Sequence, residues 1–325
     1  MKSFSKVGIM ILIALFSILL LSACNNSEEY TEGLLFTQVS GGYSVSRGDA
    51  TDNHIIIPSL YNGQEVIAIA DKGFRQSNIK SIYIPSTVIS IGNMSFYNCS
   101  SLTIITIPDS VTNIGNKAFA GDLLAEMKLA TVTFGDNSQL TSIGSGAFSY
   151  CTSLVSITIP NSVTSLGCEA FYACTSLTTI TFGDNSQLTS IGSLAFGNCS
   201  SLTEMIIPEG VTSIDSSTLF NCSSLENITI PDKVTSIGDN AFFGCSSLES
   251  ITIPDSVTSI GGWAFDNCSS LTSVTVESAT PPSLGNDAFY STHSTLKIYV
   301  PSESVETYKS ASDWSNWSSR IYAKP

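Results

Sequence analysis

The sequence predicts a solenoid, a stack of similar coils, and three features of the chain point to it. Residues 230–252 read IPDKVTSIGDNAFFGCSSLESIT, and residues 253–275 repeat them as IPDSVTSIGGWAFDNCSSLTSVT. A large apolar residue, nearly always Phe, returns about every 23 residues. Each repeat also holds a stretch in which Leu and Ile alternate with small polar residues, the period of a strand with one buried face. One such unit cannot bury its apolar side alone, whereas stacked copies can.

The Phe position sets the register of the repeats and predicts about ten coils between residues 57 and 300. The residues at this position are Phe74, Phe96, Phe119, Phe148, Phe171, Phe196, Leu219, Phe242, Phe265 and Phe289.

Each repeat is expected to begin with the buried strand and a corner. In residues 246–254, SSLESITIP, the side chains of Leu248, Ile251 and Ile253 are predicted to point inward. Pro254 has no backbone N–H, so it ends the strand and turns the chain. A second extended piece follows, after which Gly261 is expected to supply a positive φ for a turn. The remaining inward positions of this repeat are Val257, Ile260, Ala264, Phe265 and Cys268.

The L-x-x-I-x-I core of each strand, with a period in the low twenties, falls in the range of leucine-rich repeats. It recurs at Leu102, Leu154, Leu225, Leu248 and Leu271. The LTSITIP…VTSIG..AF..C pattern resembles the BspA-type subclass of bacterial leucine-rich repeats over about three quarters of the chain. This resemblance implies a right-handed solenoid of parallel β-strands with short helical or 3-10 turns. It also implies a secreted or surface protein, and adhesion is the function of some members.

The first 23 residues have the pattern of a bacterial lipoprotein signal peptide. Lys2 and Lys6 precede an apolar stretch at residues 7–21, and the junction Leu-Ser-Ala-Cys24 resembles a lipobox. The resemblance implies that Cys24 becomes the first mature residue and carries the lipid that holds the protein on the membrane. An uncleaved membrane anchor is the alternative. Residues 24–33 are predicted to be a flexible tether, and its acidic start resembles signals that send some lipoproteins to the cell surface.

Irregular segments on both sides of the repeats are predicted to be caps. Residues 34–65 are expected to form an N-terminal cap and the first strand, and residues 66–300 the solenoid. Residues 301–325 resemble the C-terminal cap common in this family. The aromatic residues there are expected to lie over the open end of the stack, and an exposed patch for glycan stacking is the alternative. They are Tyr308, Trp314 and Trp317, accompanied by Ile321.

Two departures from the repeat occur inside the solenoid. After Phe119, the residues Leu124, Met127 and Leu129 are expected to keep the inward pattern, with about six extra residues following. The segment FGDNSQLTSIGS occurs at residues 134–145 and again at residues 182–193. Its Gly-Asp-Asn-Ser suits a turn, and one carboxylate per loop is a poor ligand set for calcium.

Seven cysteines share one position of the repeat, which predicts buried thiols placed by packing. Disulfides between neighbouring coils are the alternative in an exported protein. Cys168 lies outside this series, and no Cys-x-x-Cys or paired His suggests zinc. The series, called here the cysteine ladder, is Cys99, Cys151, Cys174, Cys199, Cys222, Cys245 and Cys268.

Charge and motifs exclude several functions. The chain has 13 basic and 27 acidic residues, and removal of the leader with Lys2 and Lys6 leaves a net charge of −16. Such a surface disfavours nucleic acid and anionic lipid. His54 and His293 are the only histidines. The sequence shows no triad, P-loop or dinucleotide motif, so neither catalysis nor a cofactor is expected.

The sequence therefore predicts a cell-surface lipoprotein whose solenoid binds a protein or glycan, including host extracellular matrix. A periplasmic or cell-wall scaffold and a glycan-active enzyme are the alternatives. The outward side of the strands is the candidate site, since solenoids present such faces for binding. Arg47-Gly48-Asp49 matches an integrin-binding tripeptide, and a turn in the N-terminal cap is the competing interpretation. The candidate residues on the strands are Glu204, Glu226, Glu249, Thr229, Thr252 and Thr275.

Overall fold

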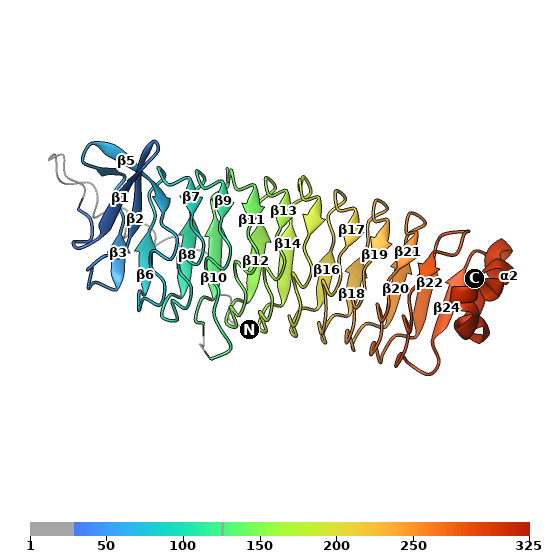
Figure 1. The fold of residues 1–325 in the computed structure, drawn as a ribbon. Helices are drawn as coiled ribbons and strands as arrows, with labels where there is room; N and C mark the ends of the chain where they lie inside the picture. Colours follow the sequence, from blue (N-terminus) through green and yellow to red (C-terminus); the bar gives the residue numbers. More distant parts are fainter. Residues whose placement is uncertain (1–28, 125–126) are drawn as a thin grey trace, which may run out of the picture.

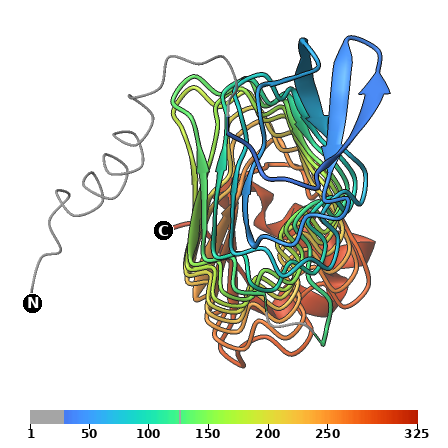
Figure 2. The ribbon, with the colours of Figure 1, turned by 90° about the vertical axis from the view of Figure 1, so that its left-hand side faces the viewer.

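The computed structural model describes residues 29–124 and 127–325. It confirms the solenoid: the coils follow one another along one axis from the N-terminal to the C-terminal end (Figure 1). Each regular coil contains a strand of three or four residues, a corner, a strand of two residues and a run of turns. The coils superpose when the stack is viewed end-on (Figure 2).

The longer strands form one side of the stack, the long-strand face. Neighbouring strands pair in parallel, so that Thr252 lies beside Thr275 and Thr106 beside Thr133. The strands of this face, in order, are β3 (His54–Ile56), β6 (Ser81–Tyr83), β8 (Ile104–Ile107), β10 (Thr131–Phe134), β12 (Ser156–Ile159), β14 (Thr179–Phe182), β16 (Glu204–Ile206), β18 (Asn227–Thr229), β20 (Ser250–Ile253), β22 (Ser273–Val276), β24 (Lys297–Val300) and β25 (Ile321–Ala323).

The two-residue strands form a second side, the short-strand face. They are β7 (Ser90–Ile91), β9 (Asn113–Ile114), β11 (Ser142–Ile143), β13 (Ser165–Leu166), β15 (Ser190–Ile191), β17 (Ser213–Ile214), β19 (Ser236–Ile237), β21 (Ser259–Ile260) and β23 (Ser283–Leu284). At the N-terminal end this sheet continues through β5 (Gln64–Ile69) and β2 (Gly42–Ser46) to β1 (Leu35–Val39). A short strand, β4 (Leu60–Tyr61), pairs with β5 in antiparallel fashion.

The third side consists of successive turns, for example residues 93–98, and the helices described all lie at residues 302–320. The expectation that Gly261 supplies a positive φ was wrong. A Cβ there would lie 2.4 Å from the backbone N of Asp239, so Gly261 is required because two coils approach closely. The positive φ occurs two residues later, at Trp263 (53°), and again at Asn267 (63°).

A column of rings fills the centre of the stack. Every residue at the predicted Phe position is at most 1% exposed. Consecutive rings are nearly parallel, with centroids 5.0 Å apart for Phe96 and Phe119 and 5.7 Å for Phe171 and Phe196. Leu219 takes the place of a ring between Phe196 and Phe242 and is equally buried. The register predicted from the sequence is therefore confirmed.

The cysteine ladder consists of buried free thiols, as predicted, and no disulfide joins the cysteines within the described residues. Each thiol donates a hydrogen bond to a backbone carbonyl of the preceding coil, for example Cys99 to Phe74 at 3.0 Å and Cys245 to Leu219 at 3.3 Å. Burial raises the pKa of the Cys199 thiol to about 12, so it stays protonated at neutral pH. Cys168 is exposed.

The irregular coil differs from its expected form. Met127 and Leu129 are buried, but Leu124 is 96% exposed, so its predicted inward position was wrong. Pairing of β10 with β8 places Leu129 at the position of Leu102. Four of the extra residues therefore precede β10, in the segment that holds the exposed Leu123 and Leu124, and only two follow it in the Gly-Asp-Asn-Ser segment.

Different structures lie at the two ends of the stack. At the N-terminal end, β1 and β2 form an antiparallel hairpin whose second strand pairs with β5. At the C-terminal end come η1 (Ser302–Ser304), α2 (Val305–Ser310) and η2 (Ser312–Arg320). There the rings of Trp314 and Trp317 both contact Phe289, the last member of the ring column. Trp314 also donates a hydrogen bond to the carbonyl of Pro282 at 2.8 Å.

Candidate binding face

The long-strand face carries four shallow depressions along the stack. Their volumes are 370 Å³ at β3 and β6, 770 Å³ at β10 and β12, 430 Å³ at β14 and β16, and 510 Å³ from β16 to β20. Because the strands are parallel and in register, side chains that point outward form columns across neighbouring coils. The face is therefore an elongated surface with repeated features.

One column of outward-pointing residues on this face is rich in threonine. Hydroxyl groups are close enough to bond between coils, as between Thr106 and Thr133 at 3.0 Å. Strand pairing together with the repeat register gives the order of this column, with apolar or aromatic residues near both ends. Its members are Ile56, Tyr83, Thr106, Thr133, Thr158, Thr181, Ile206, Thr229, Thr252, Thr275, Tyr299 and Tyr322.

The candidate glutamates are all exposed on neighbouring coils, but they do not share one column. Glu204 pairs with Asn227, whereas the N–H of Glu226 bonds to the carbonyl of Thr203, one residue before β16. Glu249 lies at the same position as Glu226, because the N–H of Thr272 bonds to its carbonyl. Glu226 and Glu249 therefore share one column, and Glu204 is displaced from it by one residue along the strand direction.

The candidate threonines occupy one column but differ in exposure. Thr229 and Thr252 are exposed, whereas Thr275 is half-buried between Thr252 and Tyr299. Thr275 is thus less accessible than the other two candidate threonines.

The depression from β16 to β20 combines an exposed apolar side chain with a rim of carboxylates. Ile206 in its floor is 70% exposed, far more than is usual for an isoleucine on a strand. Glu204, Asp232 and Glu277 line the same depression, and Glu277 forms an ion pair with Lys324. Neither Asp232 nor Glu277 was predicted from the sequence, because both lie at corners just after β18 and β22, outside the alternation of the strands.

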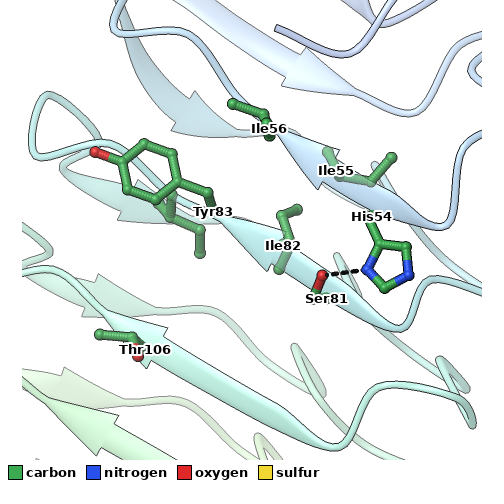
Figure 3. Close-up of a pocket in the computed structure, with 8 residues that line it drawn as sticks. His54, Ile55, Ile56, Ser81, Ile82, Tyr83 and Thr106 are labelled. Atoms are coloured by element: carbon green, nitrogen blue, oxygen red, sulfur yellow. Dashed lines mark hydrogen bonds between the residues drawn. The ribbon is translucent and has the colours of Figure 1, made fainter. Parts of the chain in front are cut away.

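The depression at the N-terminal end is more apolar (Figure 3). Tyr83 is 52% exposed and lies near Ile56, while His54 and Ser81 lie toward the other end of the same strands. The ring Nδ1 of His54 is 2.8 Å from the hydroxyl of Ser81. Sequence reasoning missed this depression, although Tyr83 stands at an outward position of a strand, a signal that could have indicated it.

The Ser81–His54 contact is not part of a catalytic triad within residues 29–124 and 127–325. Asp52 is close by, but its carboxylate accepts a hydrogen bond from the backbone N–H of His54 rather than from the ring. A triad needs a third group that orients the imidazole. The contact therefore positions two polar side chains on an exposed strand.

The Arg-Gly-Asp tripeptide forms a turn after β2. The guanidinium of Arg47 is turned toward its own chain, with Nε donating to the carbonyl of Ala50 at 3.0 Å. Asp49 is exposed, and its N–H bonds to the carbonyl of Gly33 at 2.9 Å. Gly48 has a φ of 53°, and a Cβ on it would lie 2.4 Å from the same carbonyl. These contacts fix the tripeptide against the start of β1.

The repeated Gly-Asp-Asn-Ser segments are turns, as predicted. Asp136 and Asn137 occupy a turn in which the N–H of Ser138 bonds to the carbonyl of Gly135 at 3.2 Å. The N–H of Asn137 also bonds to the carboxylate of Asp109 in the preceding coil at 3.2 Å. In the part of the chain that the structure describes, no group of three His, Cys, Asp or Glu side chains is placed to hold a metal ion.

Together, the stacked coils and the exposed strand columns define a repeat protein with an extended surface for binding. The BspA type Leucine rich repeat region (6 copies) matches residues 67–185, 125–248 and 212–316. The chain therefore belongs to the BspA-type leucine-rich repeat family. None of the helices within the described residues is long and apolar enough to cross a membrane.

A solved structure supports the fold. The crystal structure of a leucine-rich repeat protein from T. pallidum is 26% identical, with a TM-score of 0.52, and the match covers 68% of this chain and 91% of that chain. A leucine-rich repeat protein from Bacteroides ovatus is 27% identical, with a TM-score of 0.41, and the match covers 93% of this chain and 100% of that one. Among curated proteins, no match was found.

Proposed function

We propose that this protein is a lipid-anchored cell-surface protein whose long-strand face binds an extended, basic segment of another protein. The depression from β16 to β20 carries the proposal, because an exposed Ile206 lies among the carboxylates of Glu204, Asp232 and Glu277. A segment that alternates cationic and apolar side chains would meet both features, since its side chains follow the same two-residue period as the strands. The protein's net negative charge would speed the encounter with such a segment.

The anchor follows from the leader, which lies outside the described residues. Cys24 follows a lipobox-like Leu-Ser-Ala, so it would carry acyl chains that hold the solenoid at the membrane. Mass spectrometry of the mature N-terminus should show an acylated Cys24, and Cys24→Ser should release the protein from the membrane. A mature chain that begins elsewhere without lipid would refute the anchor and leave the binding face untouched.

Reversing the charge of the face should weaken binding of a basic partner. We expect the triple change Glu204→Lys, Glu226→Lys and Glu249→Lys to weaken binding of a synthetic peptide that alternates Lys with Leu by at least about tenfold, because like charges brought together cost several kcal/mol. Binding to the unaltered protein should also weaken as salt rises. Biolayer interferometry at low and high salt measures both effects.

A matched control separates the face from net charge. Glu65→Lys, Glu169→Lys and Asp287→Lys change the total charge equally but lie away from the long-strand face, and Lys117 already occupies the left-handed position that corresponds to Glu169 and Asp287. This control should lose much less affinity than the triple variant of the face, because only the long-range attraction of the net charge is reduced. Equal loss in both variants would show that only net charge matters.

The Arg-Gly-Asp turn is assigned to the cap in this proposal. Arg47→Ala and Asp49→Glu should leave attachment to integrin-bearing cells unchanged, because Arg47 is engaged with Ala50 and is not displayed. If Asp49→Glu abolished attachment while the triple Lys variant attached normally, the binding site would belong to the N-terminal cap.

A further inference from the structure

The short-strand sheet ends differently at its two ends. At the C-terminal end, β23 packs against η2. At the N-terminal end the sheet ends on β1, whose only strand partner among the described residues is β2. Four of the five residues of β1 are exposed, including Leu35 at 56% and Val39 at 39%. An exposed edge strand is a template for another strand, and native proteins protect such edges with charges, proline or a cover. β1 (LFTQV) has neither a charge nor a proline.

The register of the hairpin determines which backbone groups of β1 bond to β2 and which point away from it. Val39 pairs with Gly42 across a two-residue turn, so Val39, Thr37 and Leu35 exchange their backbone hydrogen bonds with β2. The N–H and C=O groups of Phe36 and Gln38 then point away from β2. Figure 2 shows the blue hairpin standing at the edge of the superposed coils.

The two aliphatic side chains of β1 lie symmetrically about Thr37. Leu35 and Val39 lie two residues to either side of it on the same face of the strand, and Phe36 and Gln38 lie one residue to either side. In an antiparallel pair with Thr37 opposite Thr37, Leu35 of one copy faces Val39 of the other. Phe36 and Gln38 meet as a hydrogen-bonded pair, each donating and accepting one backbone bond. The edge is therefore complementary to itself, as a two-fold interface requires.

Charge limits where two copies can meet. The chain is strongly acidic, with 27 Asp and Glu against 13 Lys and Arg, so most contacts between two copies would bring like charges together. The uncharged β1 avoids this repulsion. We propose that the protein forms a homodimer through antiparallel pairing of β1 with β1, which joins the short-strand sheets of two copies into one continuous sheet.

Disulfide trapping tests the dimer in the full-length protein. The proposed axis places two Thr37 Cα atoms about 4.5 Å apart, within the range that a disulfide spans. We expect Thr37→Cys, in a Cys168→Ser background that removes the exposed native thiol, to give a covalent dimer on a non-reducing gel after mild oxidation of producing cells. Ser40→Cys is the matched control, because the two copies would hold it about 20 Å apart. The Thr37→Cys dimer should be at least about tenfold more abundant than that of the control.

A second variant and a measurement on the unaltered protein test the dimer independently of any misfolding of Thr37→Cys. Leu35→Lys added to Thr37→Cys should abolish trapping, because it places a charge opposite Val39 of the other copy. Val39→Lys should have the same effect. In the unaltered protein, hydrogen exchange at the amides of Phe36 and Gln38 should slow as protein concentration rises. Equal trapping of Thr37→Cys and Ser40→Cys, or exchange at these two amides that is independent of concentration, would overturn the dimer.

Discussion

Phe242→Ala is expected to lower the free energy of unfolding by about 3–5 kcal/mol, the usual cost of deleting a buried aromatic side chain. Phe242 is fully buried and stacks on Phe265 with centroids 5.1 Å apart. Its other neighbour in the column is Leu219, whose side chain is too small to fill the space that the ring leaves. The cavity therefore persists, and urea unfolding should report the full loss.

Phe243→Ala is the matched control for this prediction. Phe243 is the next residue, also stacks on a ring, that of Phe220 at 5.0 Å, and is only half-buried on the turn side. Its loss should cost clearly less. Hydrogen exchange in the Phe242→Ala variant should rise first around residues 219–268, since coils are coupled mainly to their neighbours. A cost below about 1 kcal/mol for Phe242→Ala would contradict the ring column.

Gly261→Ala should destabilise the protein by about 1–3 kcal/mol or more, the usual cost of forcing an added methyl group into a packed site. The new Cβ would lie 2.4 Å from the backbone N and 2.6 Å from the carboxylate of Asp239 in the preceding coil. Backbone atoms cannot rotate aside as a flexible side chain can, so the spacing of the two coils would have to change. Thermal unfolding of the variant measures the loss.

Gly262→Ala provides the comparison at the adjacent residue. Its added Cβ would come no closer than 3.3 Å, to the carbonyl of Asn286, and its φ is not positive. We expect a smaller loss than at Gly261. If both substitutions cost the same, the close approach of coils at Gly261 would not be the reason for the glycine, and a general effect of backbone entropy would explain both.

The sequence predicted the coil register, the ring column and the buried cysteines because each is a one-residue feature repeated at a fixed period. It could not predict contacts that arise only when one coil meets the next. Gly261 is an example, since its close neighbour Asp239 lies 22 residues earlier in the chain. The hydrogen bonds from the cysteine thiols to carbonyls of the preceding coil are another.

The candidate face was predicted less completely than the fold. Strand alternation places Glu204 and Thr229 outward, as the structure has them, but the stagger of the glutamates depends on which residues pair between coils. Asp232 and Glu277 reach the β16–β20 depression from corners just after β18 and β22, where the strand period ends. The exposed Leu124 was mistaken for a core residue because its four-residue insertion shifts the pattern before β10.

Site-specific photo-crosslinking tests most directly whether the long-strand face binds a partner. A photoreactive amino acid at Thr229 would stand on this face, and one at Thr235 would stand on the short-strand side of the same coil, where Thr235 is also exposed. If the long-strand face binds an extended basic segment, irradiation with the Lys–Leu peptide should label the protein from position 229 and not from position 235. Labelling from position 235 alone would contradict the binding face.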